Sequence, residues 1–594
     1  MKIGAVCNYS LSRPLSFGRK PREDEKPAIK RDVQEGLKIL DKNMAIILPA
    51  SCSPSYYEND TGVGQPYSES SNELLYPFLN DWGFTVLQRQ PSGLGKQTDA
   101  SPYVANLSAY NTAVINLEEL TKPDMGRILS RETYLDIVEN NPQRGRNKSA
   151  YLYYVQANKT ALDEAYVIFD YKRNNMDKLP AEEQKAIEKL DYEFNQFKKE
   201  QGDKQEKNAL YSLLTDINRN DYWPNWENEV DKNLFASPKS EYDKELKEAR
   251  LSDLREAYEN EIDSFLFSQM LAKKNIDEGR KSLNENGIKG IGDIPIAFSD
   301  AEVWGNKDLF LDDLRMGCKE PWSNEPQKWG FFVLDPDKLF NQDGSLGEAG
   351  EFLYEKYEKA FEENKGGVRI DHVVGLMDPY VYSVNGNQRE GRLYSELYKG
   401  VNGDKCDRIL KEIVLPAANA AGLDSSNVIA EDLGYMPGST KETLKELGIG
   451  GVTVTQWCDE HTVWNAPKNN AVMIANHDTK TAKELYPDKM ERRSKFIELF
   501  SSGAKNIQVF WTDLFGEKER YNVPGVTGDK NWSLRMTPDF EDTYYKRLEE
   551  NDALNIPEAV LEANRRRNPN FSRDHQWLAE SLKHWSNVLK EKED

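Results

Sequence analysis

Short apolar runs that end in polar residues recur along the chain, with helix-patterned text between them. Two lie near the start, "MAIILPA" (44–50) and "FTVLQRQPSG" (84–93), separated by a helical pattern over "NELLYPFLNDWG" (72–83). Six more follow residue 287: "IKGIGDIPIAFSD", "GGVRIDHVVGL", "NVIAEDLGY", "GGVTVTQWCDE", "NAVMIANHDTK" and "KNIQVFWTDLFG". Strands of this kind that alternate with helices are typical of parallel sheets in a (β/α)8 barrel. We therefore predict an α/β fold built on a (β/α)8 (TIM) barrel, whose carboxyl strand ends face the active site.

A doubly wound open sheet is the alternative fold for the same alternation. Nucleotide-binding sheets of that kind carry GxGxxG or GxxxxGK[ST] directly after a strand. Neither pattern follows any strand predicted here, so the barrel is favoured.

The text between residues 118 and 286 is long, charged and helical in pattern. Two apolar stripes run through it, Ile187, Leu190, Phe194 and Phe197, and then Leu251, Leu254, Tyr258, Ile262 and Phe265. Stripes at this spacing predict amphipathic helices. We predict a large, mostly helical insertion over 118–286, which separates a first barrel part (44–117) from a second (287–594) that ends in helices. Residues 1–43, polar and punctuated by Pro, Arg and Lys, are expected to form an N-terminal extension.

Composition limits the partners. Lys and Arg number 78 and Asp and Glu number 100, which gives a net charge of −22. This balance argues against nucleic acid or an anionic membrane as the main partner. Five scattered cysteines without a CxxC pair fit neither a disulfide framework nor a zinc site, and no apolar stretch has membrane-spanning length. We expect a soluble, cytoplasmic protein without a metal.

Three predicted strands end in a carboxylate, Asp371 in "VRIDH", Glu431 in "VIAEDLG" and Asp478 in "IANHDT". A lone carboxylate after an apolar strand is more often a helix N-cap or one half of an ion pair, so their joint arrangement carries the inference. Retaining cleavage of a glycosidic bond needs a carboxylate nucleophile and a carboxylic acid roughly 5 to 5.5 Å apart. Three converging carboxylates can supply both groups.

Arg369 precedes Asp371 by two residues, on one face of a strand whose other face carries Val368 and Ile370. A fixed cation at this place would keep the aspartate ionised and oriented, as a nucleophile requires. A structural Arg–Asp pair that closes the barrel is the alternative.

Two of the five histidines, His372 and His477, stand directly beside these acidic residues. As neutral donors they would hydrogen-bond sugar hydroxyls. A zinc role is disfavoured because they lack HExxH spacing and cysteine neighbours. Histidines that satisfy purely structural hydrogen bonds are the alternative.

The motifs around these residues resemble those of the amylomaltase family of 4-α-glucanotransferases, a branch of the α-amylase-like retaining barrel enzymes. The resemblance is carried by "GDIPI", "RIDH", "AEDLG", "NHDT", "SPYVANLSAYN", "QKWG" and "NVPGVTGDKNWSLR". The last of these matches the family's N-x-P-G-T-x(4)-N-W-x-x-R pattern except at Val526, where the family has Thr. Together the motifs cover roughly residues 44–120 and 260–540.

The resemblance implies that Asp371 is the nucleophile, Glu431 the general acid/base and Asp478 the stabiliser of the transition state. It further implies that Arg369 and His477 hold the sugar at the cleavage subsite. Four more residues match positions that line the family's sugar groove, namely Tyr103, Asp293, Trp329 and Asn522. For the tryptophan a packed core position is the alternative, and for the aspartate of "GDIPI" a strand-end cap.

The predicted reaction is transfer of α-1,4-glucan segments between maltooligosaccharides by double displacement, without metal or organic cofactor. Glu431, protonated because neighbouring carboxylates raise its pKa, donates to the glycosidic oxygen while Asp371 attacks the anomeric carbon. Two rivals stay open: an α-1,4-glucan hydrolase that uses the same carboxylates, and a non-catalytic glucan-binding protein. A monomer or homodimer is expected.

The chain departs from the family in the lid that precedes the nucleophile strand. Where the family has a PPDYF-like run, this chain has "RMGCKEPWSNEPQKWG", in which Trp322 is the candidate aromatic residue and Glu320 or Glu325 the candidate acid. The family's "THDNDT" is also altered, to "NHDTKT". Acceptor handling and chain-length preference therefore do not transfer to this chain.

Overall fold

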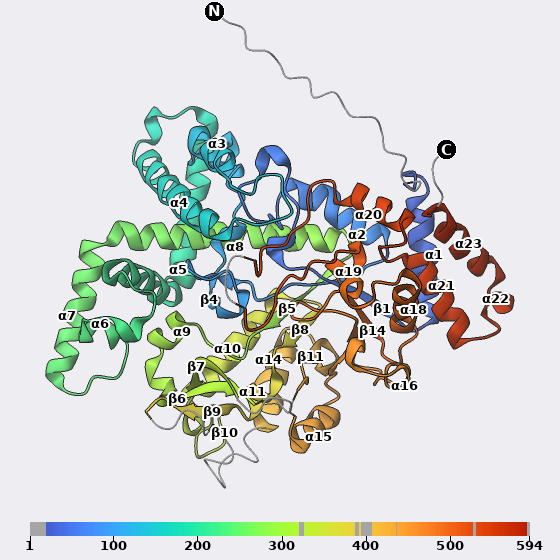
Figure 1. Cartoon of the computed structure of the whole chain (residues 1–594). Coiled ribbons are helices and arrows are strands. Elements are labelled where there is room, and N and C mark those ends of the chain that lie inside the picture. Colours follow the sequence, from blue (N-terminus) through green and yellow to red (C-terminus); the bar gives the residue numbers. More distant parts are fainter. Residues whose placement is uncertain are drawn as a thin grey trace, which may run out of the picture.

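A closed barrel of eight parallel strands forms the centre of the computed structural model, which describes residues 20–319, 326–385, 391–393, 407–434, 436–526 and 530–590 (Figure 1). The strands are β1 (Asn43–Ile47), β2 (Val86–Gln88), β5 (Lys289–Ile294), β8 (Gly367–Ile370), β11 (Val428–Ala430), β12 (Val452–Val454), β13 (Ala471–Met473) and β14 (Asn506–Phe510). Neighbours in chain order are neighbours in the sheet, and β14 pairs with β1. Every strand lies in one of the eight predicted apolar runs, so the predicted barrel is confirmed.

The barrel closes between β11 and β12 through sparse backbone pairing. Ile429 and Gly450 form an isolated parallel bridge, and the Ala430 N–H donates to the Gly450 carbonyl at 2.8 Å. The next bond across this seam comes from a side chain, because the Asp432 carboxylate accepts from the Val452 N–H at 2.8 Å. A carboxylate therefore replaces a backbone carbonyl at the end of β11.

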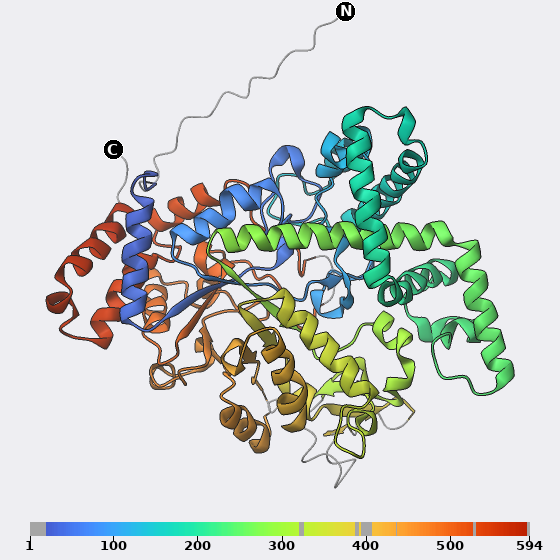
Figure 2. The same cartoon turned by 180° about the vertical axis from the view of Figure 1, so that it is seen from behind.

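Helices cover the outside of the barrel and bring the two ends of the described chain together. They include α1 (Lys26–Ile39), α2 (Tyr76–Asp81), α10 (Glu348–Glu363), α14 (Leu415–Ala420), α15 (Gly438–Leu447), α18 (Lys489–Phe500), α20 (Phe540–Glu549), α21 (Ile556–Arg567) and α23 (Gln576–Val588). Helix α1 lies beside α21 and α23 (Figures 1 and 2). Its Asp32 accepts from the Trp585 indole at 3.0 Å, and Gly36 is needed because a Cβ there would overlap Val560. The described part of the extension is thus largely helical.

Long helices between residues 131 and 285 project from one side of the barrel (Figure 2). They are α3 (Arg131–Glu139), α4 (Tyr151–Arg173), α5 (Ala181–Asn218), α6 (Glu229–Lys232), α7 (Glu241–Ala257) and α8 (Glu259–Glu285). Phe169 of α4 stacks on Phe267 of α8 with ring centroids 4.4 Å apart, and Phe194 of α5 meets both rings edge-on. These contacts tie the three longest of the listed helices into one aromatic core.

The second predicted stripe, Leu251 to Phe265, is wrong as a single helix. The chain breaks at Tyr258, where φ is −129° and ψ is 31°, so that α7 ends and α8 begins. Periodicity alone does not detect this bend, because the apolar residues keep their spacing across it.

A four-stranded antiparallel sheet, absent from our prediction, stands beside the carboxyl end of β8. It is formed by β6 (Phe310–Cys318), β7 (Gln327–Leu334), β9 (Tyr380–Ser383) and β10 (Arg392–Leu393). A two-stranded sheet, β3 (Gly93–Leu94) with β4 (Asn106–Tyr110), follows β2. Among the residues that the structure describes, no helix is both long enough and apolar enough to cross a bilayer.

Candidate active site

One buried arginine joins two carboxylates at the ends of β5 and β8. The register of these strands pairs Asp293 with Arg369. The Arg369 Nη1 lies 2.7 Å from Asp293 Oδ1 and 2.9 Å from Asp371 Oδ1. Asp293 and Arg369 are almost fully buried, whereas the Asp371 side chain keeps 26% of its surface exposed. The arginine therefore fixes one oxygen of the candidate nucleophile while part of the Asp371 side chain stays exposed to solvent. Asp293 is the second ion-pair partner of Arg369 rather than a strand cap.

Three aromatic rings, those of Tyr103, His477 and Trp532, pack together beside Asp293. The Tyr103 hydroxyl donates to Asp293 Oδ2 at 2.8 Å, and its ring stacks on His477 with centroids 5.0 Å apart. Trp532 packs against both rings, at 5.9 Å from Tyr103 and 5.8 Å from His477. Trp532 was missed as a site residue, although it belongs to the quoted "NVPGVTGDKNWSLR" motif and that motif was the available signal.

The candidate acid, Glu431, follows β11. Its Oε2 accepts from the backbone N–H of His372 at 2.7 Å, and its own N–H donates to the Ile370 carbonyl at 2.9 Å. Burial raises the pKa of Glu431 to about 7, which the Arg369 charge opposes and the Asp371 carboxylate reinforces. Our prediction that neighbouring carboxylates are the main cause is thus wrong, because desolvation contributes more.

His372 is in the left-handed region of backbone space, at φ 42°, which for a residue with a side chain occurs chiefly at turns and functional sites. This conformation turns its N–H toward Glu431. Burial lowers the pKa of His372, which favours the neutral ring. Its ring meets Trp329 edge-on at 4.9 Å, and Trp329 donates from Nε1 to Gln327 Oε1 at 2.9 Å. Trp329 is partly buried and packs against the hydrophobic core, so its role in sugar stacking stays a prediction.

Asp478 is held by two donors. His477 Nε2 lies 3.1 Å from Oδ2, and Asn522 Nδ2 donates to Oδ1 at 2.6 Å. Burial opposes ionisation of Asp478, but the His477 charge and these hydrogen bonds lower its pKa to about 2. Burial likewise disfavours a charged His477, yet the adjacent Asp478 carboxylate raises the pKa of His477 overall. The contact with Asp478 thus shifts His477 toward the protonated form, whereas the predicted role was that of a neutral donor.

The structure brings all ten predicted site residues into one connected group, and the candidate lid residues Glu320, Trp322 and Glu325 lie outside the described residues. In the part of the chain that is described, no group of three or more His, Cys, Asp and Glu side chains is arranged to hold a metal ion.

A closed barrel with a protonatable glutamate and an arginine-bound aspartate at the ends of neighbouring strands carries the two kinds of carboxyl group that retaining cleavage of a glycosidic bond requires. Comparison with known families agrees with this class. The chain belongs to glycoside hydrolase family 77, described as 4-alpha-glucanotransferase, whose model matches residues 56–541.

Individual relatives are distant in sequence. The chain is 22% identical over 347 residues to a 4-alpha-glucanotransferase of Chlamydia pneumoniae, covering 51% of this chain and 62% of the relative. It is 25% identical over 363 residues to a chloroplastic/amyloplastic 4-alpha-glucanotransferase of Arabidopsis thaliana, covering 52% and 58%. These matches thus span about three fifths of the relatives' length. The fold is similar to that of an amylomaltase from Streptococcus agalactiae, solved in complex with acarbose, with a TM-score of 0.66, 17% identity and coverage of 93% of this chain and 100% of that one.

Proposed function

We propose that this protein is a 4-α-glucanotransferase that moves α-1,4-glucan segments between maltooligosaccharides. The observation that carries the proposal is the contrast between two neighbouring carboxyl groups. Asp371 forms an ion pair with Arg369 at 2.9 Å, whereas burial raises the pKa of Glu431 to about 7. One group is thus suited to attack as an anion and the other to give and take a proton near neutral pH.

The reaction has two steps with matched proton transfers. In the first, an Asp371 oxygen forms a bond to the anomeric carbon while the glycosidic bond breaks and Glu431 gives its proton to the leaving 4-oxygen. In the second, the Glu431 carboxylate removes the proton from the 4-hydroxyl of an acceptor glucan, whose oxygen displaces Asp371. Two inversions restore the α-configuration and regenerate both groups.

The remaining polar groups act on the sugar ring and on its charge. We assign Asp478, with its pKa lowered to about 2, to the hydroxyls of the ring that flattens in the transition state. His477 and Asn522 hold this carboxylate from two sides, at 3.1 and 2.6 Å. Tyr103 holds Asp293, which in turn fixes Arg369. Trp329 and His372 meet edge-on and supply a second aromatic surface for the sugar.

Incubation with pure maltotriose, followed by sizing of the products, tests the proposal. Transfer gives glucose together with a ladder of longer maltooligosaccharides. A mixture of only shorter products would mean that water is the acceptor and that the protein is a hydrolase. Unchanged maltotriose, in a preparation that still binds maltooligosaccharides, would favour the glucan-binding alternative. The Asp371→Ala variant is the blank for all three outcomes.

We further propose a cytoplasmic location in maltodextrin or storage-glucan metabolism, as a monomer or homodimer. Support comes from the composition, since five cysteines are scattered over the chain without a CxxC pair. Fractionation of cells and light scattering of the purified protein test the two statements.

A further inference from the structure

Arg89 is a buried cation without a counter-ion. It follows β2 and is only 8% exposed. Its Nη2 donates to the Tyr76 hydroxyl at 2.8 Å, and its Nη1 makes only long contacts, to the Leu48 carbonyl at 3.4 Å and to Ser53 Oγ at 3.5 Å. Its Nε has no hydrogen-bond partner among the described residues, and none of their carboxylates forms an ion pair with it. A charge in this position is expensive to bury unless a partner supplies negative charge or strong acceptors.

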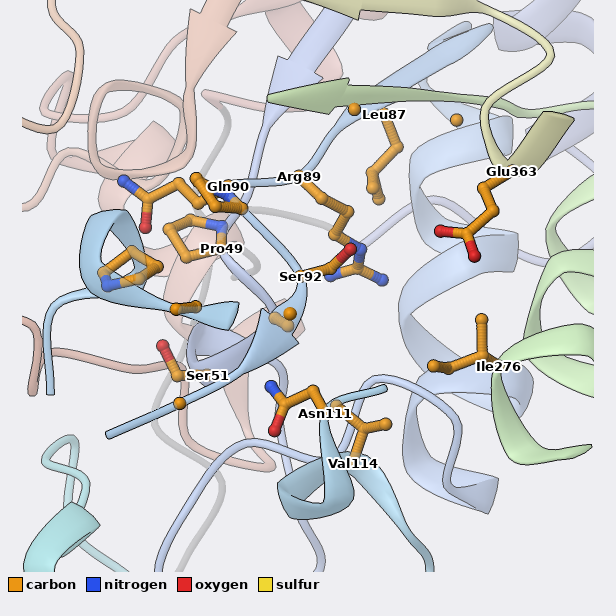
Figure 3. A pocket seen from close by; sticks show the side chains of 18 of the residues that line it. Pro49, Ser51, Leu87, Arg89, Gln90, Ser92, Asn111, Val114, Ile276 and Glu363 are labelled. Carbon is orange, nitrogen blue, oxygen red and sulfur yellow. The ribbon is translucent and has the colours of Figure 1, made fainter. Parts of the chain in front are cut away.

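The guanidinium of Arg89 points into a cavity between the barrel wall and helix α8 (Figure 3). Ser92 lies next to it, Asn111 reaches in from below, and Glu363 faces it from the far wall. The Asn111 Oδ1 already accepts from the Ala113 N–H at 3.0 Å, so its amide N–H₂ is the group left for the cavity. The groups beside Arg89 are therefore mainly donors.

The charge of the lining is opposite to that of the protein. Its charged side chains are Arg89, Arg280, Lys365 and Glu363, three cations and one carboxylate, in a chain whose net charge is −22. Glu363 is already engaged, because its Oε2 lies 3.1 Å from Arg280 Nη2. Lys365 is exposed to solvent and donates to the Ala421 carbonyl at 3.3 Å. Arg89 thus remains as the buried charge of this lining that has no counter-ion among the described residues.

We propose that this cavity binds a small phosphate-bearing anion, with Arg89 as its principal ligand and Asn111 and Ser92 as neutral donors. Arginine suits the task because its planar fork presents several N–H groups to an oxyanion at once. The free group could be inorganic phosphate or the phosphate of a sugar ester, and both present the same oxygens to the site. The site is separate from the catalytic carboxylates.

The cavity also touches the active-site wall. Ser101 and Pro102, which precede Tyr103, line it together with Trp532, the ring packed against Tyr103 and His477. An anion on Arg89 would therefore contact the segment that carries Tyr103, and its binding is expected to change maltotriose turnover as well as stability.

Binding is tested on the full chain with inorganic phosphate, glucose 1-phosphate and glucose 6-phosphate, each at constant ionic strength. The readouts are the shift of the unfolding midpoint with ligand concentration and the broadening of the ligand's phosphorus resonance, neither of which requires activity. Saturable binding of at least one of the three is expected. A sugar phosphate that binds much more tightly than phosphate identifies an ester as the ligand, and equal affinity identifies the free ion.

The variants separate the site from general charge effects. Arg89→Met should weaken binding by about tenfold or more and Asn111→Ala by a few-fold. Arg573→Met, which removes one exposed charge on helix α22 (Phe571–Asp574), should bind as the wild type does. Arg89→Lys keeps the charge and guards against failure of the methionine variant to fold, and it should bind at an intermediate affinity. Absence of saturable binding to the wild type, or equal binding by the wild type and both Arg89 variants, would overturn the proposal. Because the readout is binding, this result is independent of the maltotriose experiment.

Discussion

The strand ends of the barrel and the core of the helical insertion are built from opposite groups. At the strand ends, Arg369 bridges two carboxylates and a third, Glu431, is buried with its pKa raised to about 7. In the insertion, Phe169, Phe194 and Phe267 are buried and pack against one another through stacked and edge-on rings. Buried charges add little net stability, whereas buried aromatic contacts add much. Substitutions at the strand ends should therefore lower the rate of the reaction. Substitutions in the core of the insertion should lower the free energy of unfolding.

The largest expected effect is on the rate, from Asp371→Ala. Without the nucleophile no glycosyl-enzyme forms, so the initial rate of glucose release from maltotriose should fall by at least about 10⁴-fold. The free energy of unfolding in urea should stay within about 1 kcal/mol of the wild type, because the side chain is partly exposed and Arg369 keeps Asp293. Retained activity would remove Asp371 from the mechanism.

Phe267→Ala should act in the opposite way. Loss of a fully buried ring that contacts three other rings should lower the free energy of unfolding by about 3 to 5 kcal/mol. Turnover per folded molecule should be unchanged. Tyr192→Ala, on the same insertion but 66% exposed, is the matched control and should stay within about 0.5 kcal/mol. A drop in turnover at full folding would show that the insertion takes part in catalysis.

Glu431→Gln should change how the free energy of unfolding depends on pH. The folded pKa of about 7 lies above the ordinary value of 4.5, so the folded wild type binds more protons than the unfolded chain between these values and loses stability as pH rises through that range. Glutamine carries no such penalty. Relative to the wild type the variant should be about 1 to 2 kcal/mol more stable at pH 8 and equally stable near pH 4, while its activity is strongly reduced. Urea unfolding at the two pH values measures the difference. If the variant and the wild type were equally stable at both pH values, ionisation of the buried Glu431 carboxyl group would not cost stability.

The smallest expected effect comes from Tyr103→Phe. The change removes only the hydrogen bond from the hydroxyl to Asp293, 2.8 Å long, and keeps the ring stacked on His477. A loss of about 1 kcal/mol in transition-state stabilisation, or roughly fivefold in kcat/KM, is expected. Tyr192→Phe is the control. A much larger loss would mean that the hydroxyl also contacts the substrate.

The barrel was predictable because buried parallel strands leave a short apolar run with polar residues at its end. All eight runs fit strands, from Asn43–Ile47 to Asn506–Phe510. The break at Tyr258 was not predictable, since helix α8 continues the apolar spacing of α7. The antiparallel sheet of β6, β7, β9 and β10 was missed because its strands come from segments that are far apart in the sequence, with the barrel strand β8 between β7 and β9. The division of the chain at residues 43, 117 and 286 stays a prediction.

At the site, the residue types were predictable and the partners were not. Arg369 was expected to form an ion pair with Asp371. The sequence "GDIPI" does not indicate that Asp293 is a second ion-pair partner of Arg369, because that pairing depends on the register between β5 and β8. The raised pKa of His477 follows from a 3.1 Å contact with Asp478 that a sequence does not contain. The roles of the ten site residues remain proposals.

The seam of the barrel has a consequence for exchange with solvent. A cylinder of strands opens first where the fewest backbone bonds have to break, and between β11 and β12 there is a single bridge supplemented by the Asp432 carboxylate. The amides of β11 and β12 should therefore exchange their hydrogens sooner than those of β1 and β14, which pair along five residues. Glu431 directly follows β11. Local opening of the barrel is therefore expected first beside the residue that we assign to proton transfer.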